Sequence, residues 1–227
     1  VFLPETLKIK IKERLNLAKP FKNIVTAFFF FFLRSVMPTS FLFTAGFSVF
    51  TTFFGLILVN NFAFTQGNVG DFFFYIGFWI ALVQGVITAR VAKKFKDYQV
   101  IRVSIFITAV SLLAFYFIPA GDSKWLFLIP PFLALGNGLT MAFNTALISR
   151  ITPRELQGEA LGINASVMAL AQGIPVILIG YITVGGATLP ILVGSVVIAA
   201  GGVMFWLLFK PGRDDKFAAP SGAEVQV

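Results

Sequence analysis

Cysteine and histidine are both missing from the 227 residues of this sequence. Without cysteine, the sequence has no disulfide and no thiolate metal site. Without histidine, it has neither the base of a serine–histidine dyad nor a histidine-ligated metal. Charge is scarce as well, because only 12% of the residues are Asp, Glu, Lys or Arg. These absences exclude the commonest hydrolytic chemistries.

Apolar residues, in contrast, make up 57% of the sequence, and its mean hydropathy is +0.87. A soluble domain of this length needs far more polar surface, so the composition predicts a membrane protein. A transmembrane helix needs about 20 mostly apolar residues. The first such stretch is placed after Arg34, because an arginine in mid-bilayer is unfavourable. We therefore predict six spans, over 36–59, 69–89, 101–119, 125–148, 162–183 and 188–209.

The basic residues are distributed very unevenly between the two sides of these spans. Of the 18 lysines and arginines, 17 fall on the side that carries both ends of the chain. Only Lys124 falls on the other side, with Asp71 and Asp122. The positive-inside rule then predicts that both ends are cytoplasmic. The same distribution argues against nucleic-acid binding, because the charges are placed as anchors beside anionic headgroups.

Three parts follow from this pattern. Residues 1–22 form a basic linker in which leucine or isoleucine recurs every four residues, consistent with an amphipathic helix on the membrane. Residues 23–209 form the six-helix bundle. Residues 210–227 form a polar tail with a composition typical of disorder. The fold class that we expect is an all-α membrane protein.

The stretch ITPRELQGEALG, residues 151–162, places charged and turn-forming residues between two apolar runs. Thr152 can cap a helix, Pro153 suits its first position, and Glu155 can reach back to the Thr152 amide. We therefore expect a short cytoplasmic helix that leads into the fifth span. The segment is either a solvated helix start or part of a functional loop.

Three stretches of the sequence resemble the major facilitator superfamily of transporters. LGNGLTMAFNTALISRITPRELQGEALGINASVMALAQGIP (135–175) looks like the tenth-to-eleventh helix region, closest to bacterial drug:proton antiporters and tetracycline-efflux proteins. QGVITARVAKKFKD (84–97) is similar to the signature loop between the second and third helices of each half. Ala89 departs from that pattern, which usually has Asp there. LPETL (3–7) resembles the exit from the sixth helix into the central linker.

The resemblance implies that the chain is the C-terminal six-helix half of a twelve-helix transporter, in a prokaryotic cell membrane. It implies alternating access and proton-coupled efflux of small amphiphilic molecules. The partners would be the substrate, the lipid bilayer, and a missing N-terminal half or a second copy. It also implies two inverted three-helix repeats. In agreement, ALVQG (81–85) and ALAQG (169–173) fall at corresponding places of the second and fifth spans.

Ionisable residues fall at the ends of the predicted spans or between them, and none is placed in the interior of a span. A proton-coupled transporter needs an intramembrane ionisable group, so an antiporter would keep its proton carrier in the other half. The sequence shows no paired carboxylates, phosphate loop or nucleophile–base pair. We therefore expect no enzyme activity, no cofactor and no metal.

Neutral polar side chains within the spans are the candidates for a substrate pathway. Asn137 and Asn144 share a helix face, and Gln84 and Gln172 lie on the second and fifth spans. An amide in hydrocarbon is costly unless it faces water or a neighbouring helix, so each is either a substrate contact or an interhelical hydrogen bond. The full set of candidates is Phe47, Gln84, Asn137, Thr140, Met141, Asn144 and Gln172.

Two further patterns have alternative interpretations. Phenylalanines at helical spacing in the first span either contact a lipophilic substrate or simply pack and face lipid; they are Phe43, Phe47, Phe50 and Phe54. Glycine and proline clusters in the fourth and fifth spans mark either flexible breaks or close helix packing. These clusters are Pro130-Pro131, Gly136 to Gly138 and Gly173 to Pro175.

The charged ends of two connections are candidates for a cytoplasmic gate, which by resemblance to the family would clasp the other half. They are Arg90, Lys93, Lys94, Glu155 and Glu159. The alternative to a half-transporter is a complete six-helix membrane protein, acting as a homodimeric transporter or as a permease or scaffold subunit.

Overall fold

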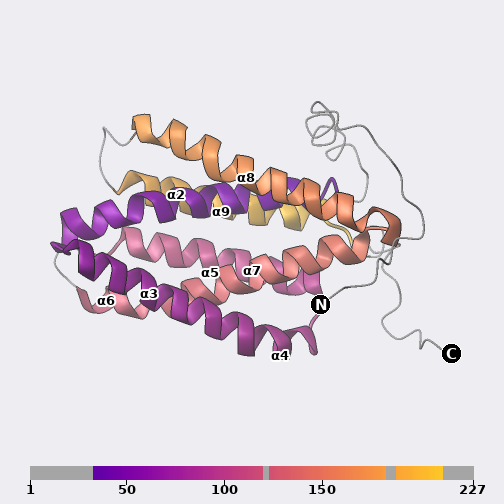
Figure 1. Cartoon of the computed structure of the whole chain (residues 1–227), viewed down its shortest axis with the longest axis horizontal. Coiled ribbons are helices and arrows are strands. Elements are labelled where there is room, and N and C mark those ends of the chain that lie inside the picture. The colour runs from indigo at the N-terminus through magenta and orange to yellow at the C-terminus, as the bar shows by residue number, and fades with distance from the viewer. Residues whose placement is uncertain (1–32, 120–122, 183–187, 212–227) are drawn as a thin grey trace, which may run out of the picture.

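The computed structural model describes residues 33–119, 123–182 and 188–211 (Figure 1). Within these ranges every regular element is a helix, and six helices are long and apolar enough to cross a membrane. The all-α class and the six spans are therefore confirmed. The predicted linker at 1–22 and nearly all of the predicted tail lie outside the described residues. The helices are α2 (Met37–Phe62), α3 (Gln66–Leu82), η1 (Val83–Ile87), α4 (Thr88–Ala92), α5 (Asp97–Tyr116), α6 (Ser123–Leu128), α7 (Pro130–Ile151), η2 (Arg154–Leu156), α8 (Gln157–Ile182) and α9 (Leu189–Leu208).

Proline marks where several of these helices begin. It occupies one of the first two positions of α2, α7 and α9, as Pro38, Pro130 and Pro190. Proline is tolerated there because the first amides of a helix have no partner within the helix. Pro130 therefore starts a new helix and divides the fourth span into α6 and α7. Pro175 lies inside α8, which is assigned as helix from end to end.

The six spans pack as two equivalent three-helix units. The first unit contains α2, α3 and α5, and the second contains α7, α8 and α9. Helix α2 packs mainly on α9 and α8, whereas α7 packs mainly on α5 and α3. If α2, α3 and α5 are exchanged with α7, α8 and α9, the α2–α9 contact becomes α7–α5 and the α2–α8 contact becomes α7–α3. The α5–α9 contact is unchanged by this exchange and also joins the two units. This symmetry is that of an inverted repeat.

Glycines bring the equivalent helix pairs α5–α7 and α2–α9 into close contact, and each pair joins one unit to the other. A Cβ built on Gly136 of α7 would lie 2.5 Å from Thr108 Oγ1 of α5. A Cβ on Gly46 of α2 would lie 2.5 Å from Gly194 O of α9. Since α7 is assigned as helix throughout, the Gly136 to Gly138 cluster serves close packing, and the alternative of a flexible break there is wrong. Small residues at contacts between membrane helices have this role in general.

Three contacts show which helix ends lie together. Arg150 at the end of α7 forms an ion pair with Asp97 at the start of α5, at 3.2 Å. Arg102 Nη2 donates to Phe209 O just after α9, at 3.0 Å, and Ser35 Oγ donates to Leu208 O, at 3.3 Å. The starts of α2 and α5 and the ends of α7 and α9 thus share one end of the bundle. Apart from Lys124, the described lysines and arginines belong to the helix ends and connections on this side.

Two local predictions are corrected by the structure. Thr152 ends α7 rather than capping the next helix, because its hydroxyl donates to Ile148 O at 2.6 Å and the residue that precedes η2 is Pro153. Helix α5 begins at Asp97, four residues before the predicted start. Asp97 is therefore the first residue of this membrane-spanning helix, and Arg102 lies in its second turn.

Candidate functional site

One side of the bundle is formed by α8, α2, α7 and α3, with α5 and α9 behind them (Figure 1). On this side α8 packs on α2 and α3 packs on α7, and a hydrogen bond joins α2 to α7. We call this side the open face. Helices α3 and α8 at its two edges are the least covered: only 17% and 28% of their spans are buried, against 56% for α2. The two edge helices of the open face are therefore less covered than the helices between and behind them.

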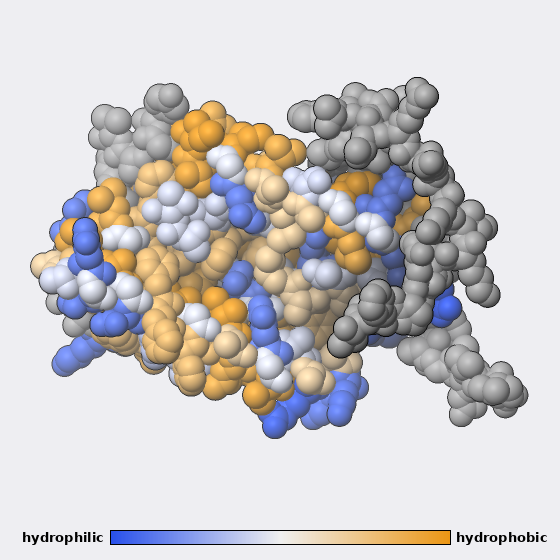
Figure 2. Space-filling model, in the orientation of Figure 1, coloured by the Kyte–Doolittle hydropathy of each residue, from blue (hydrophilic) through white to orange (hydrophobic). Residues whose placement is uncertain are grey.

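Besides Thr51 and Thr52 of α2 and the polar residues at the ends of α2 and α3, three neutral polar residues are exposed within the spans that form this face: Gln84, Thr145 and Gln172. We call them the polar belt. Hydrophilic side chains interrupt the otherwise apolar middle of this side of the molecule (Figure 2). An exposed amide at membrane depth is unfavourable in lipid, so such residues normally face a partner or water.

Contacts between neighbouring helices connect the belt across the face. Ser48 Oγ of α2 donates to the backbone oxygen of Gln172 on α8, at 3.1 Å. Asn144 Nδ2 of α7 donates to Ser40 Oγ of α2, at 2.8 Å. A Cβ on Gly138 of α7 would lie 3.7 Å from Gln84 Cγ. These contacts join α8 to α2, α2 to α7 and α7 to η1.

Gln84 lies in the π-helix η1, where the backbone hydrogen bonds shift from the α pattern. Val83 O accepts the Thr88 amide and also the Thr88 hydroxyl, at 3.1 Å. The extra residue in this turn leaves Gln84 and Gly85 exposed. Short π-helices of this kind occur frequently at functional sites. Sequence reasoning missed η1, and the only local signal was Gly85 inside an apolar helix.

The α7 candidates fall into two groups. Thr140 and Asn144 are buried and hydrogen-bonded to other helices, Thr140 to Ser104 at 2.7 Å. Of the two roles predicted for these residues, substrate contact and interhelical hydrogen bond, the structure shows the hydrogen bond. Asn137 is also buried, at 7% exposure, but its Oδ1 has no hydrogen-bond partner. Met141 is half-buried beside them, on the side of α7 that turns toward the belt.

Asn164 on α8 is a further residue of this kind, and the sequence reasoning passed over it. It is 4% exposed, its Nδ2 lies 3.3 Å from Met168 Sδ, and its Oδ1 has no partner. Together with Asn137 it gives the face two buried amide oxygens whose hydrogen-bonding capacity is unused. Buried amides are normally paired, so unpaired ones are candidates for ligand or water contact.

The phenylalanine stripe of α2 is mostly structural. Phe50 and Phe54 are buried and pack against Phe115 of α5, with ring centroids 5.6 and 4.8 Å from that of Phe115. Phe43 is buried as well, so packing rather than substrate contact accounts for these three rings. Phe47 is half-buried and lies 6.4 Å from the Phe43 ring. It is the one member of the stripe that stays a candidate.

The gate candidates lie at the basic end of the bundle. Arg90, Lys93 and Lys94 are exposed at the end of α4, and Glu159 is exposed in the first turn of α8. Within the described part of the chain, none of the three basic side chains forms an ion pair. The Glu155 side chain lies outside what the structure describes. Whether these residues clasp another half stays a prediction.

Small residues follow the exposed sides of both edge helices. On α3 and η1 they are Gly70, Gly77, Ala81 and Gly85, and on α8 they are Gly162, Ala165, Ala169 and Gly173. We call them the small-residue stripes. A Cβ on any of the five glycines just named would meet nothing within 4 Å. Each stripe contains one copy of the repeated motif, ALVQG or ALAQG, so the repeat maps to equivalent exposed surfaces.

Comparison with known proteins agrees with this geometry. The family model of the Major Facilitator Superfamily matches residues 36–226. No curated protein and no solved structure matches the chain. The family consists of membrane transporters of small molecules rather than enzymes, and its match covers all six spans. This chain therefore belongs to the major facilitator superfamily.

Proposed function

We propose that this chain is one half of an alternating-access transporter and that its open face lines the substrate pathway. The polar belt carries this proposal, because Gln84, Thr145 and Gln172 are exposed in membrane-spanning helices. Exposure of these groups to lipid is unfavourable, whereas exposure to a water-filled pathway is not. The unpaired oxygens of Asn137 and Asn164 supply acceptors just beneath the face.

The second half would dock along α3 and α8, on the small-residue stripes. Exposed glycine and alanine let the backbones of membrane helices approach closely, and such surfaces typically contact another helix. An N-terminal six-helix unit preceding this chain in the same polypeptide is the partner that we propose. A second copy of the chain is the alternative partner. A role as a permease or scaffold subunit is the weaker alternative function, because it does not explain why the polar belt is exposed.

Small amphiphilic molecules are the substrates that this lining favours. The candidates combine neutral amides and hydroxyls with Met141 and Phe47, which together suit ligands that have polar and apolar parts. The lining candidates carry no charge, so the half shown here offers no intramembrane proton carrier among them. For proton-coupled efflux, as in the drug:proton antiporters, the carrier would reside in the other half.

The mass of the native polypeptide tests the half-transporter proposal. An antibody raised against the C-terminal tail would be applied to membranes of the source cell. We expect a band near twice the 24.8 kDa of this chain. A band at 24.8 kDa would contradict the proposal that a six-helix unit precedes this chain in the polypeptide, and would favour pairing of two copies of the chain. Substrate export from proteoliposomes of the purified native protein, with and without an imposed pH gradient, then tests transport and its coupling separately.

A further inference from the structure

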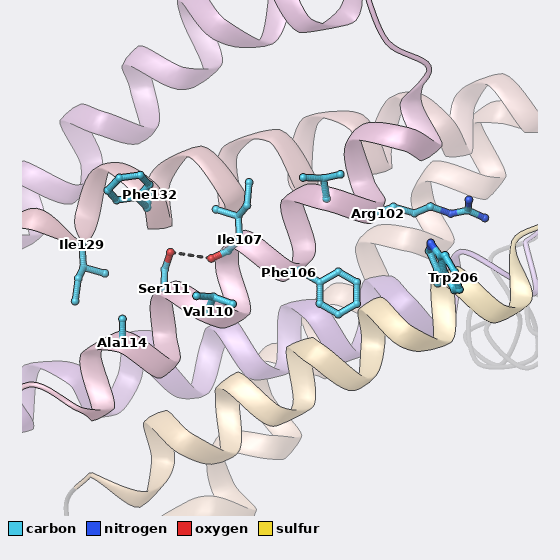
Figure 3. Close-up of a pocket in the computed structure, with 10 residues that line it drawn as sticks. Arg102, Phe106, Ile107, Val110, Ser111, Ala114, Ile129, Phe132 and Trp206 are labelled. Atoms are coloured by element: carbon cyan, nitrogen blue, oxygen red, sulfur yellow. Dashed lines mark hydrogen bonds between the residues drawn. The ribbon is translucent and has the colours of Figure 1, made fainter.

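A long apolar groove lies on the other side of the bundle, along α5, between the start of α7 and the end of α9. It has a volume of about 650 Å³ and follows α5 from Arg102 to Ala114. Figure 3 shows Arg102 and Trp206 at one end, Ile129 and Phe132 near the other, and Phe106 and Val110 between. Val110 and Phe132 are 63% and 56% exposed, so the groove opens to the surroundings of the bundle.

The groove has one polar group along its length, and that group is already satisfied. Ser111 Oγ donates to Ile107 O of its own helix at 2.7 Å (Figure 3). The remaining lining between the two ends is aliphatic or aromatic. The interior therefore suits a hydrocarbon chain and offers a polar ligand nothing to bind.

Arg102 closes one end of this groove with an unbalanced positive charge. Its guanidinium lies 5.6 Å from the Tyr98 ring centroid and 5.7 Å from that of Trp206. Nη2 donates to Phe209 O at 3.0 Å, while Nε is buried without a hydrogen-bond partner. Among the described residues, no carboxylate lies within ion-pair distance of it. The two rings and the carbonyl hold the guanidinium in place without neutralising it.

An arginine inside a membrane-spanning helix is unfavourable unless an anion or water compensates it. A phosphodiester is the anion that matches a guanidinium best, since its oxygens can accept two parallel hydrogen bonds. Arg102 lies at the basic end of the bundle, which the positive-inside rule places at the cytoplasmic leaflet, where anionic lipids are concentrated.

The dimensions of the groove fit one lipid chain. Twelve residues separate Arg102 from Ala114, which corresponds to about 18 Å at 1.5 Å per residue. Half of the hydrocarbon core of a bilayer is about 15 Å thick. A chain that starts below a phosphate at Arg102 would thus reach the far end of the groove near the bilayer midplane.

We propose that this groove binds one anionic phospholipid, with its phosphate on Arg102 and one acyl chain along α5. Three observations support this occupant: a guanidinium that no carboxylate among the described residues neutralises, an interior whose one polar group is already hydrogen-bonded, and a length that matches one leaflet. The proposal does not depend on transport by the open face, because α5 and α9 lie behind α2 and α7.

Quenching of Trp206 fluorescence tests the proposal, since this side chain lines the groove. The full native polypeptide would carry Trp206 as its single tryptophan, with Trp79→Phe, Trp125→Phe and any other tryptophan replaced. It would be placed in phosphatidylcholine vesicles that contain phosphatidylglycerol with brominated acyl chains, or brominated phosphatidylcholine instead. From the quenching we expect the groove to bind phosphatidylglycerol about fivefold more strongly than phosphatidylcholine, which is the effect of one well-placed basic residue.

Two variants make the test specific. Arg102→Gln should reduce the preference to about equal binding of the two lipids, and Lys94→Gln, an exposed basic residue outside the groove, should leave it intact. Equal quenching in the parent protein would overturn the proposal. So would a preference that survives Arg102→Gln, or one that Lys94→Gln lowers as much, because a diffuse surface charge would then explain it. Unchanged gel-filtration profiles of both variants show that the bundle is intact.

Discussion

Gly46 of α2 and Gly194 of α9 are in backbone contact at the centre of the bundle. A Cβ on Gly46 would lie 2.5 Å from Gly194 O, and a Cβ on Gly194 would lie 2.7 Å from Gly46 O. Neither position can hold a larger residue unless the helices separate. Since α5 and α7 repeat this arrangement at Gly136, close glycine contacts hold both three-helix units together.

Gly46→Ala should therefore destabilise the bundle. Overpacking of a well-packed contact costs about 1–3 kcal/mol, and here the obstructing atom is a backbone oxygen that cannot rotate away. Gly158→Ala, in the first turn of α8 and outside the small-residue stripes, is the matched control, because its Cβ would meet nothing within 4 Å and alanine is the better helix former. The thermal unfolding midpoint in detergent should fall for the first variant and stay level or rise for the second. Equal midpoints would show that α2 and α9 are not in this contact.

Asn137 and Asn144 should respond differently to replacement by alanine. Asn144→Ala removes the hydrogen bond to Ser40, and a bond of this kind in a membrane protein contributes about 0.6 kcal/mol. Asn137→Ala removes an unpaired buried oxygen, so stability should be unchanged or improved. If Asn137 contacts substrate, the same variant should reduce transport by the native protein. Loss of stability without loss of transport would assign Asn137 a packing role only.

The gate prediction concerns Arg90, which is exposed at the end of α4. Arg90→Gln in the native protein should shift the population of outward-open molecules and slow transport, because it removes a charge that would hold the other half. Lys96→Gln, at a neighbouring exposed position, serves as control. Conformational populations can be followed by distances between spin labels on the two halves. The prediction fails if both transport and populations match those of the parent protein.

Sequence alone predicted those features that depend on the length and average polarity of a segment. The six spans and the one-sided lysines and arginines needed only residue counts. The roles of individual residues within the spans could not be predicted equally well, because lipid is as apolar as the protein interior. Phe43 and Phe50 therefore have the same hydrophobic signature whether they are buried or face lipid, and only the packing distinguishes them.

Polar and glycine residues were ambiguous for a related reason. Gly136 lies in a close helix contact, whereas Gly77 lies on an open surface, and the local sequence does not distinguish the two kinds of position. Thr152 can cap the helix before it or the one after it, and the contact with Ile148 O decides. The π-helix at Gln84 depends on a hydrogen-bond shift that no periodicity reveals. The sequence nonetheless indicated Gln84 and Gln172, the amides of the second and fifth spans, as candidates, because any polar residue there needs a partner or water.

Cysteine labelling tests the central claim, that the open face lines an aqueous pathway, most directly. The described chain has no cysteine of its own, so Gln84→Cys, Gln172→Cys and Val110→Cys can each be the single thiol of this half. Val110 is exposed on the opposite groove. In membranes, a membrane-impermeant maleimide should label the cysteines at positions 84 and 172 and leave the one at 110 unreacted. Equal, negligible labelling at all three positions would mean that the polar belt is buried or faces lipid, and would contradict the account.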